Sequence, residues 1–500
     1  MEAFNDYDDY DAVGLARLIS AGDVQADALV EAAAERIAKA NPAVNAVIWD
    51  RIEDAGLEAR STDQRGPFAG VPILIKDLVV EADVPVTFGS VFFRNYIGDT
   101  TSEFSRRIER AGFITVGRSN TPEFGLLPTT EPVLHGPTRN PWDLSRSAGG
   151  SSGGAAAAVA AGIVPLAQAS DGGGSIRIPA SATGLFGLKV SRGRSPRQPG
   201  GPVDYLSSEH AVTRSVRDSA AFLDATHGAN PGDRYWAPEP RAPFTEAVAR
   251  DPVRLRIGFS IRDFRGDIVH PECEAAVLAT AALLEELGHD VVETSPAVDG
   301  NAMAAAFIEV WAALAANAFS TVLDAACERF PAVRRLRRAA GDRRTMRLVA
   351  RLDQRDSGLP PFEPFTVHLA TRSSRRSQAD LLTAEASLQA IAHETAAFLT
   401  DYDAFLTPVL GSPPVPLGWF DQSLPWDELI ERVYRYVAFT PLANFAGLPA
   451  MSVPLHWTPD GLPVGSHFLG RFGDEETLLS LAGQLERTQP WADRRPSGSC

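Results

Sequence analysis

The segment from residue 149 to residue 194 reads GGSSGGAAAAVAAGIVPLAQASDGGGSIRIPASATGLFGLKVSRGR. It holds two glycine-rich loops that each carry a serine, and an alanine-rich run after the first loop predicts a helix. In the second loop three glycines precede Ser175, so side chains do not obstruct the backbone N–H groups, which can converge on one point. Donors preorganised around a developing oxyanion contribute about 2.7–4 kcal/mol each. Ser175 is therefore a candidate nucleophile, and a tight turn with a surface serine is the alternative.

The first loop fits a second pattern, because Gly149-Gly150-Ser151-Ser152-Gly153 matches G-x-S-x-G. That pattern marks the nucleophile elbow of α/β-hydrolases, which needs a strand directly before it and a partner histidine. The preceding residues NPWDLSRSA contain a proline and no β-branched run, and the nine histidines of the chain show no triad context. No Gly-Lys-Ser/Thr follows the glycines, so a phosphate-binding loop is not indicated either.

A lysine stands inside the apolar stretch FAGVPILIKDLVV, residues 68–80. Among the 47 lysines and arginines of the chain only three are lysine: Lys39, Lys76 and Lys189. Arginine cannot lose its proton in a protein, whereas a desolvated lysine can and then acts as a base. Serine–lysine catalysis without histidine is a known variant of the catalytic triad. Spacing along the chain does not place Lys76 beside either serine, so a solvated turn at the end of a strand stays an alternative.

Composition limits the classes of partner. The net charge of −16 and the pI near 5.1 argue against nucleic acid or an anionic membrane as the main partner. The three cysteines, Cys273, Cys327 and Cys500, form no CxxC pair, so neither a zinc site nor a disulfide framework is expected, and no cofactor or metal is predicted. The N-terminus is acidic without an apolar core, and no window holds 18 uncharged apolar residues. We expect no signal peptide, no membrane span and a cytoplasmic location.

The order of patterns predicts a layered α/β fold. An amphipathic helix over 102–112 lies between strand-like runs at 70–77 and 113–120, which is typical of such folds. Further strands are expected at 253–260, 402–410 and 448–457, mostly helical structure over 301–400, and an irregular excursion over 195–240. Because 500 residues exceed the usual limit of about 250–300 residues for one core, we expect two lobes or one large domain with insertions.

With these motifs in place, the chain resembles the amidase signature family. The resemblance is carried by the segment 149–194, by GPFAGVPILIKD (66–77), by GRSNTPEFG (117–125) and by the block 440–486, and it is weakest from about 200 to 400. It implies a single domain over 1–500 with a large mixed β-sheet core covered by helices on both faces, and a mainly helical insertion. Residues 61–200 and 400–490 would form the catalytic core, and about 200–400 a variable, partly helical region that shapes the substrate pocket.

The resemblance also implies residue roles. Ser175 falls on the family's nucleophile, Ser151 on the serine after a cis peptide bond that relays protons, and Lys76 on the base. The oxyanion would be held by the backbone amides of Gly172, Gly173 and Gly174. The remaining matched positions are Asp171 and Arg177, which brace the loop, Ser152, which supports Ser151, and Gly125, which lines the acyl pocket.

The implied activity is hydrolysis of a carboxylic amide to an acid and an amine or ammonia through a seryl acyl-enzyme. Within the family the chain looks nearest to bacterial amidases of the 6-aminohexanoate cyclic-dimer hydrolase type, so cyclic amides are an alternative substrate class. The glutaminase component of a tRNA-dependent amidotransferase (its A chain) is a further alternative, disfavoured because Ile178 stands where that component typically has glutamine. A non-catalytic scaffold is disfavoured because Lys76, Ser151 and Ser175 are intact. The expected partner is a small-molecule amide, and a homodimer is possible by analogy.

One departure from the family pattern lies directly before the oxyanion glycines. Many members have Gly-Thr-Asp or Gly-Ser-Asp there, whereas this chain has Ala169-Ser170-Asp171. Loops that set substrate choice are expected within 195–240 and 300–370, where the resemblance is poorest.

Overall fold

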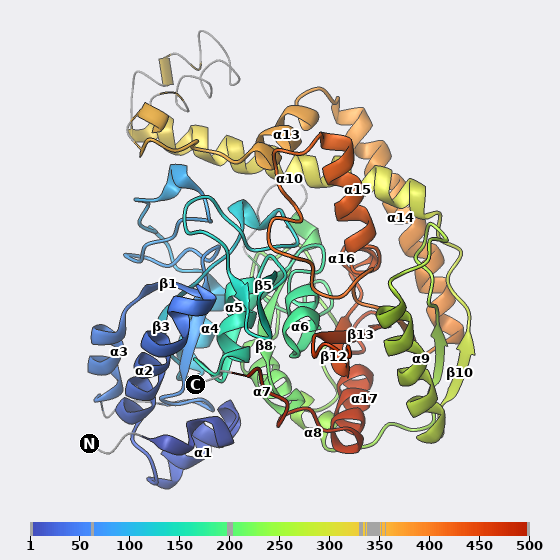
Figure 1. Cartoon of the computed structure of the whole chain (residues 1–500), viewed down its shortest axis with the longest axis horizontal. Helices are drawn as coiled ribbons and strands as arrows, with labels where there is room; N and C mark the ends of the chain where they lie inside the picture. The colour runs from blue at the N-terminus through green and yellow to red at the C-terminus, as the bar shows by residue number, and fades with distance from the viewer. Residues whose placement is uncertain are drawn as a thin grey trace.

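The computed structural model describes residues 4–61, 65–197, 204–329, 334, 335, 337, 351, 353–355 and 357–497. Within these residues eleven strands form one mixed sheet in the order β1-β3-β2-β6-β8-β7-β12-β13-β11-β9-β10 (Figure 1), and β4 and β5 form a separate pair. The strands are β1 (Val47–Asp50), β2 (Pro72–Lys76), β3 (Ile114–Ser119), β4 (Arg139–Asn140), β5 (Asp143–Ser147), β6 (Leu166–Asp171), β7 (Phe186–Lys189), β8 (Ser208–Thr213), β9 (Arg256–Phe259), β10 (Asp290–Glu293), β11 (Ala404–Pro408), β12 (Ala450–Trp457) and β13 (Pro463–Gly470).

The sheet has two parallel parts separated by an antiparallel part, and at one end β1 pairs antiparallel with β3. β3, β2 and β6 pair in parallel, as do β11, β9 and β10. Between them the chain pairs antiparallel from β6 through β8, β7, β12 and β13 to β11. Because parallel neighbours end at the same edge of a sheet, the carboxyl ends of β2 and β6 meet, and Lys76 and Asp171 are the last residues of these strands.

Alternation along the strands assigns the side chains to two cores. Leu74 of β2 and Ala167 of β6 pack on one face with the alanines of α5. Their neighbours in the two strands, Ile75 after Leu74 and Leu166 before Ala167, pack on the opposite face with side chains of α1, α4 and α7. This is the period of two expected for strands buried on both sides. The predicted α/β fold, a large mixed sheet with helices on both faces, is confirmed.

The α-helices lie before, between and after the strands along the chain. They are α1 (Ala12–Ala21), α2 (Ala26–Val44), α3 (Ile52–Ala59), α4 (Glu103–Arg110), α5 (Gly153–Ala160), α6 (Arg177–Thr183), α7 (Val216–Thr226), α8 (Phe244–Val248), α9 (Pro271–Glu286), α10 (Gly300–Arg329), α13 (Pro364–Ser373), α14 (Gln378–Asp401), α15 (Trp426–Tyr436), α16 (Pro441–Ala446) and α17 (Glu475–Thr488).

The region 195–240, expected to be irregular, contains β8 and α7, so that expectation is wrong. β8 lies between β6 and β7 within the main sheet. The expected mostly helical stretch 301–400 contains α10, α13 and α14 within its described residues, and β9 lies within the strand expected at 253–260. Between 200 and 300 helices alternate with β8, β9 and β10, which are strands of the main sheet.

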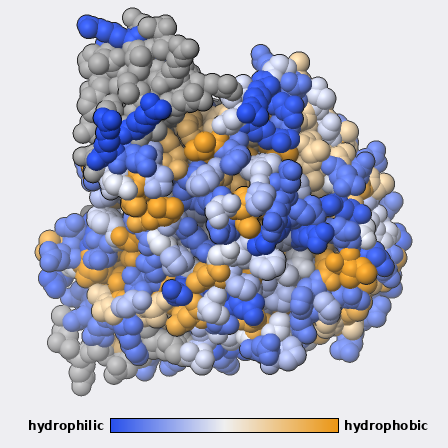
Figure 2. All heavy atoms as spheres, turned by 45° about the horizontal axis from the view of Figure 1, so that its top comes forward, coloured by the Kyte–Doolittle hydropathy of each residue, from blue (hydrophilic) through white to orange (hydrophobic). Residues whose placement is uncertain are grey.

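α10 crosses the top of the molecule in the view of Figure 1 and packs against α13 and α14. Among the described helices, its residues 300–320 are long and apolar enough to cross a membrane by length and composition. In the structure Trp311 and Ile308 are buried, and Glu309 pairs with Arg372 at 2.6 Å and with Arg376 at 2.7 Å. On the face drawn in Figure 2, hydrophobic residues form small patches separated by hydrophilic ones.

The packing of α5 against its neighbours gives a stability prediction. A Cβ atom on Gly154 would lie 2.6 Å from the carbonyl oxygen of Asn120 and 2.7 Å from that of Ala46. Backbone atoms cannot move away by rotating a side chain, so Gly154→Ala is expected to lower the free energy of unfolding by about 1–3 kcal/mol. Chemical denaturation followed by circular dichroism measures this change.

Gly56 in α3 supplies the matched control, because a Cβ atom there would meet nothing within 4 Å. Gly56→Ala is expected to raise the free energy of unfolding by about 0.5–1 kcal/mol, since alanine loses less backbone entropy in a helix. Equal stability of the two variants would contradict the close packing of α5.

Candidate active site

Lys76, the last residue of β2, has no exposed surface. Its Nζ atom lies 2.8 Å from the Oγ atoms of both Ser151 and Ser152 and 3.1 Å from Oγ of Ser170. Its backbone N–H donates to Oε1 of Gln168 at 3.0 Å, which ties the end of β2 to β6. The amine is thus surrounded by three hydroxyl groups inside the protein.

The local electrostatics favour an uncharged amine. Burial lowers the pKa of Lys76 from 10.5 to about 7, while the negative charges of Glu209 and Asp171 act in the opposite direction. Near neutral pH a large share of the amine is therefore deprotonated, and that form can accept a proton.

A second buried lysine shows that this shift alone does not identify a base. Burial also lowers the pKa of Lys189 to about 7. Its amine, however, donates to the backbone carbonyls of Val190 and Leu448, both at 2.9 Å. Lys76 differs because its amine contacts serine hydroxyls, which can exchange a proton with it.

Ser151 and Ser152 stand at the start of α5, after a cis peptide bond between Gly150 and Ser151. The hydroxyl of Thr121 donates to the carbonyl of Ser151 at 2.9 Å. The amide of Ser152 donates to the carbonyl of Ser175 at 3.3 Å, so the two glycine loops are in direct contact. Lys76 therefore lies beside Ser151 and Ser152, as expected, although these serines are 75 and 76 residues further along the chain.

A strand does precede Ser151, contrary to the sequence-based expectation. It is β5, which pairs with β4 in the small separate sheet and ends at Ser147, three residues before Gly150. His467 and His210 are bound elsewhere, to Arg177 and to Ser219. The elbow interpretation therefore gains no support.

The loop after β6 holds Ser175, which is 8% exposed, between two fixed ends. The carboxylate of Asp171 accepts hydrogen bonds from the amides of Gly174 at 2.7 Å and Ile176 at 3.1 Å. Thr440 donates to the carbonyl of Gly173 at 2.7 Å. Gly174 has a φ of +130°, a conformation in which an alanine would be strained and would meet Thr440.

The amides of this loop divide into two groups. That of Gly174 is already bound to Asp171. Those of Gly172, Gly173 and Ser175 donate to no other described residue, so they are available to a ligand. This differs from the expected set Gly172, Gly173 and Gly174 by one position.

A buried polar network fixes the loop from below. Arg177 donates to Asp171 through Nε and Nη2, both at 2.9 Å, and to Asn444 at 2.7 Å. Its Nη1 atom lies 2.9 Å from Nε2 of His467, whose Nδ1 atom lies 3.0 Å from the hydroxyl of Thr407. Burial alone would raise the pKa of Asp171, but the charge and hydrogen bonds of Arg177 hold it well below its usual range. The carboxylate is therefore ionised and paired at neutral pH.

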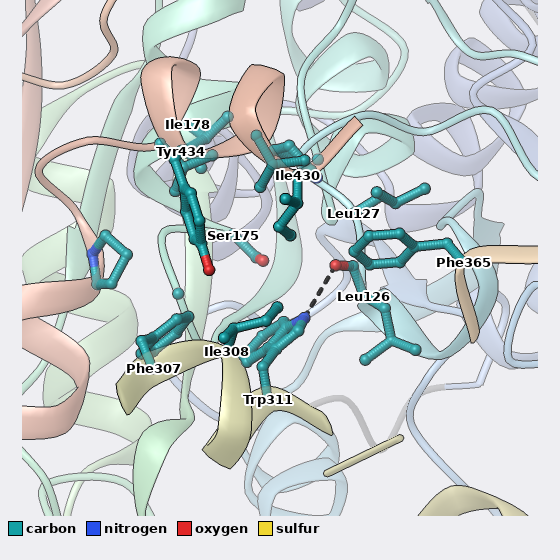
Figure 3. Close-up of a pocket in the computed structure, with 17 residues that line it drawn as sticks. Leu126, Leu127, Ser175, Ile178, Phe307, Ile308, Trp311, Phe365, Ile430 and Tyr434 are labelled. Atoms are coloured by element: carbon teal, nitrogen blue, oxygen red, sulfur yellow. Dashed lines mark hydrogen bonds between the residues drawn. The ribbon is translucent and has the colours of Figure 1, made fainter. Parts of the chain in front are cut away.

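Ser175 opens into an apolar cavity of about 570 Å³. Figure 3 shows its hydroxyl pointing between Tyr434 on one side and Trp311 on the other. The indole N–H of Trp311 donates to the carbonyl of Leu126 at 3.1 Å, which joins α10 to the segment that follows Gly125. No charged residue is among the described lining residues, which are Gly125, Leu126, Leu127, Pro128, Gly150, Gly173, Ser175, Ile178, Phe307, Ile308, Trp311, Phe365, Ile430, Val433, Tyr434, Val437 and Pro441.

A second cavity of about 1140 Å³ meets the first at Ser175, Gly125, Leu126 and Trp311. It also reaches Ser151 and Ser170, and it carries charge at Arg197 and Glu209 among the aromatic rings of Phe88, Phe93 and Phe124.

Gly125 lies where the two cavities join. A Cβ atom there would lie 3.1 Å from Oγ of Ser151 and 2.8 Å from Leu78, and its φ is +69°. Within the described residues no group of three His, Cys, Asp or Glu side chains could hold a metal ion.

The sequence profile of the amidase family matches residues 28–479. The chain belongs to the amidase family. It is a hydrolase of amide C–N bonds, as the resemblance to the amidase signature family implied.

Individual relatives in the family match along nearly the whole chain. The 6-aminohexanoate-cyclic-dimer hydrolase of Pseudomonas sp. (strain NK87) is 35% identical, with 97% of this chain and 96% of the relative covered. A putative amidase, AmiC, of Mycobacterium leprae is 37% identical over the same shares of the two chains. A solved structure of a 6-aminohexanoate cyclic dimer hydrolase superposes with a TM-score of 0.84 at 31% identity, covering 98% of this chain and 99% of the other.

Several polar residues of this amidase site are not predicted by the sequence patterns. Ser170 lies in the departure from the family pattern, but no pattern foretells its contact with Lys76. Asn444 lies within the matched C-terminal block, and Glu209 lies in the region expected to be irregular. Gln168, a polar residue within the otherwise mostly apolar start of β6, is a local sign that this strand has a buried polar partner. That partner is the backbone N–H of Lys76.

The pair Asp171–Arg177 gives a stability prediction. Both side chains are fully buried, so Arg177→Met would leave a carboxylate without its cation and is expected to lower the free energy of unfolding by about 3–5 kcal/mol. The difference from wild type should be largest at neutral pH and should shrink in acid, as Asp171 becomes protonated. Chemical denaturation at several pH values measures both effects.

The exposed pair Arg250–Glu246, whose side chains are 64% and 60% exposed, is the control. Arg250→Met is expected to change the free energy of unfolding by less than about 1 kcal/mol. An Arg177→Met variant as stable as Arg250→Met would contradict the role of the network.

Proposed function

We propose that the protein cleaves a carboxylic amide through an acyl-enzyme on Ser175, with Ser151 as proton relay and Lys76 as base. The observation that carries the proposal is the 2.8 Å contact between the buried Lys76 amine and the Ser151 hydroxyl. Ser151 and Ser175 line the same cavity, so a substrate carbonyl at Ser175 would lie next to the relay.

The proton route follows from these positions. The lone pair of Lys76 Nζ takes the proton of the Ser151 hydroxyl, and Ser151 takes the proton of Ser175 as Ser175 Oγ bonds to the amide carbon. The C–N bond breaks as the ammonium of Lys76 returns the proton, through Ser151, to the leaving nitrogen. Water then attacks the acyl-enzyme by the same relay and releases the acid.

The loop amides would hold the oxyanion of each tetrahedral intermediate. We assign this role to the N–H groups of Gly172, Gly173 and Ser175, because the N–H of Gly174 is bound to Asp171. Asp171 and Arg177 act as positioning residues that fix the loop. Ser152 supports Ser151 by giving the Lys76 amine a second hydroxyl contact.

The apolar cavity would receive the acyl group. Its described lining has no charged side chain, so an acyl chain with a charged end would lose hydration without gaining a partner. The larger cavity, which carries Arg197 and Glu209, would receive the amine part. In this proposal 61–200 and 400–490 form the catalytic core, and the helical region from α10 to α14 shapes the acyl pocket through Phe307, Trp311 and Phe365.

A second candidate is hydrolysis of cyclic amides. It is supported by the 35% identity with 6-aminohexanoate-cyclic-dimer hydrolases over 97% of the chain. Glutamine-dependent amidotransfer has weaker support, from 27% identity with the corresponding component of the glutamyl-tRNA(Gln) amidotransferase of Thermotoga maritima, and it would require further protein partners.

We further propose that the enzyme works in the cytoplasm on small molecules, without nucleic acid or a membrane surface, and that any assembly is a homodimer. The net charge of −16 supports the absence of nucleic acid and membrane partners.

The base assignment predicts the effect of Lys76→Ala. We expect kcat for a neutral amide to fall by about 10²–10⁴-fold, because the relay loses its proton acceptor. Labelling of Ser175 by a fluorophosphonate, located by peptide mass spectrometry, should slow in parallel and should vanish in Ser175→Ala. Circular dichroism checks that the variants are folded.

Lys39→Ala, at an exposed position, is the matched control and should keep both wild-type rates. Activity of Lys76→Ala close to wild type would end the base assignment. A label on Ser151 in place of Ser175 would reverse the roles of the two serines.

The apolar lining predicts a preference among acyl groups. Hexanamide should be cleaved with a kcat/KM at least about 100-fold above that of the monoamide of adipic acid, because an unpaired carboxylate costs several kcal/mol to desolvate. The two substrates have equal chain length and differ at the far end. A cyclic lactam and glutamine belong in the same assay, and equal rates for the first two substrates would contradict the assignment of the acyl pocket.

A further inference from the structure

Glu209 lies beside the proposed base and has no role in the reaction described above. It is on β8, directly across from Ser170 of β6 in the antiparallel pair. Side chains of directly opposed residues project from the same face of a sheet. Ser170 contacts the Lys76 amine at 3.1 Å, and Ser170, Glu209 and Ser151 line one cavity, so Glu209 lies on the side of β6 where the Ser170 hydroxyl meets that amine.

Gln168 connects the two groups. Its side-chain oxygen accepts from the backbone N–H of Lys76 at 3.0 Å, and its Nε2 atom donates to Oε2 of Glu209 at 2.7 Å. Gln168 is fully buried, so this bridge fixes the carboxylate of Glu209 relative to the end of β2.

Two carboxylates act on the Lys76 amine, and their surroundings differ. Asp171 is paired with Arg177 through two contacts at 2.9 Å and also accepts from Asn444, so its charge is compensated. Glu209 has Arg197 at 3.9 Å, which is a longer contact, and the amide of Gln168. Glu209 is therefore the less compensated negative charge near the amine. Its charge raises the pKa of Lys76 more than the charge of Asp171 does.

Resting on the function proposed above, we propose that Glu209 is a positioning residue that supplies the negative charge facing the Lys76 amine and so keeps Lys76 able to accept a proton. Without that charge, burial would weaken the base further, and the ammonium formed when Ser151 gives up its proton would have no nearby uncompensated anion. Burial raises the pKa of Glu209, while Arg197 and Lys76 favour its ionised form.

The charge of Glu209 can be removed with little change of shape by Glu209→Gln. The measured quantity is kcat/KM for a neutral amide between pH 5 and 9, a range of about four pH units around the pKa of Lys76. Because the substrate does not ionise in this range, the profile reports only groups of the enzyme. The acid limb of the profile reports loss of the proton from the base. In Glu209→Gln it should move to lower pH by about one unit, and the plateau should fall several-fold, because the base is weaker. Glu209→Asp keeps the charge and should keep the wild-type limb.

Arg197→Gln tests the same charge in the opposite direction. It removes the cation facing Glu209, so the amine senses more negative charge and the acid limb should move to higher pH. Arg197 has 35% of its side chain exposed, so this variant tests the idea even where Glu209→Gln does not fold. Glu285→Gln, an equal charge change on the exposed side of α9, is the control and should leave the profile unchanged.

A lower plateau with an unmoved acid limb in Glu209→Gln would show a merely structural role and overturn the inference, as would a limb that moves up. Failure of the proposed function is distinguishable, because it would appear as an active Lys76→Ala variant or an unlabelled Ser175. If Lys76→Ala is inactive and Ser175 is labelled, an unmoved acid limb contradicts only the role of Glu209 and leaves the proposed function standing.

Discussion

The structure depends on one constraint: the amine of Lys76, at the end of the parallel strand β2, must be shielded from water. Lys76 can be buried because its uncharged form needs only hydrogen-bonding partners, and three serine hydroxyls provide them. Two of these come from the loop before α5 and one from β6. The parallel pairing of β2 with β6 brings these segments to the same edge of the sheet. Desolvation thus sets both the place of the residue and the proton affinity that the proposed mechanism requires.

A second constraint concerns charge. The chain places a fully buried arginine, Arg177, directly after the loop that holds Ser175, and a buried cation is tolerated only with excellent geometry. Asp171 meets that condition with two contacts to Arg177 and two to amides of the loop. The same carboxylate therefore neutralises Arg177 and shapes the turn. This leaves the amides of Gly172, Gly173 and Ser175 without a partner among the described residues, so they can hold the oxyanion in the proposed mechanism.

Local sequence patterns predicted those parts whose environment is encoded by neighbouring residues. β2, β3, α4 and the helix α5 follow from apolar alternation, a glycine stop and alanine content. β8 was missed because polar residues stand at successive positions of the strand, which hides the strand period. Glu209 lines the site, while Ser208 binds the carbonyl of Val190 and His210 binds the hydroxyl of Ser219. β13 contains the buried polar residue His467, whose ring nitrogen contacts Arg177, 290 residues away in sequence. No local pattern predicts a contact over that separation. The lining of the acyl cavity was also not predictable, since Trp311 contacts Leu126 across 185 residues and no local pattern specifies that pairing.

α10 lines both cavities at Ser175, since Trp311 belongs to each and Leu314, Asn317 and Ala318 line the larger one. The hydroxyls that contact the Lys76 amine come from other segments, the loop before α5 and β6. The apolar cavity takes Phe307, Ile308 and Trp311 from α10, a helix outside the main sheet. The larger cavity takes Ser151, Ser170 and Glu209 from the core around Lys76. Side chains of α10 can therefore change the acyl group that fits without touching a residue bonded to the amine. A change at Glu209, by contrast, is expected to alter the proton affinity of the proposed base, and it also changes the wall of the larger cavity proposed for the amine part.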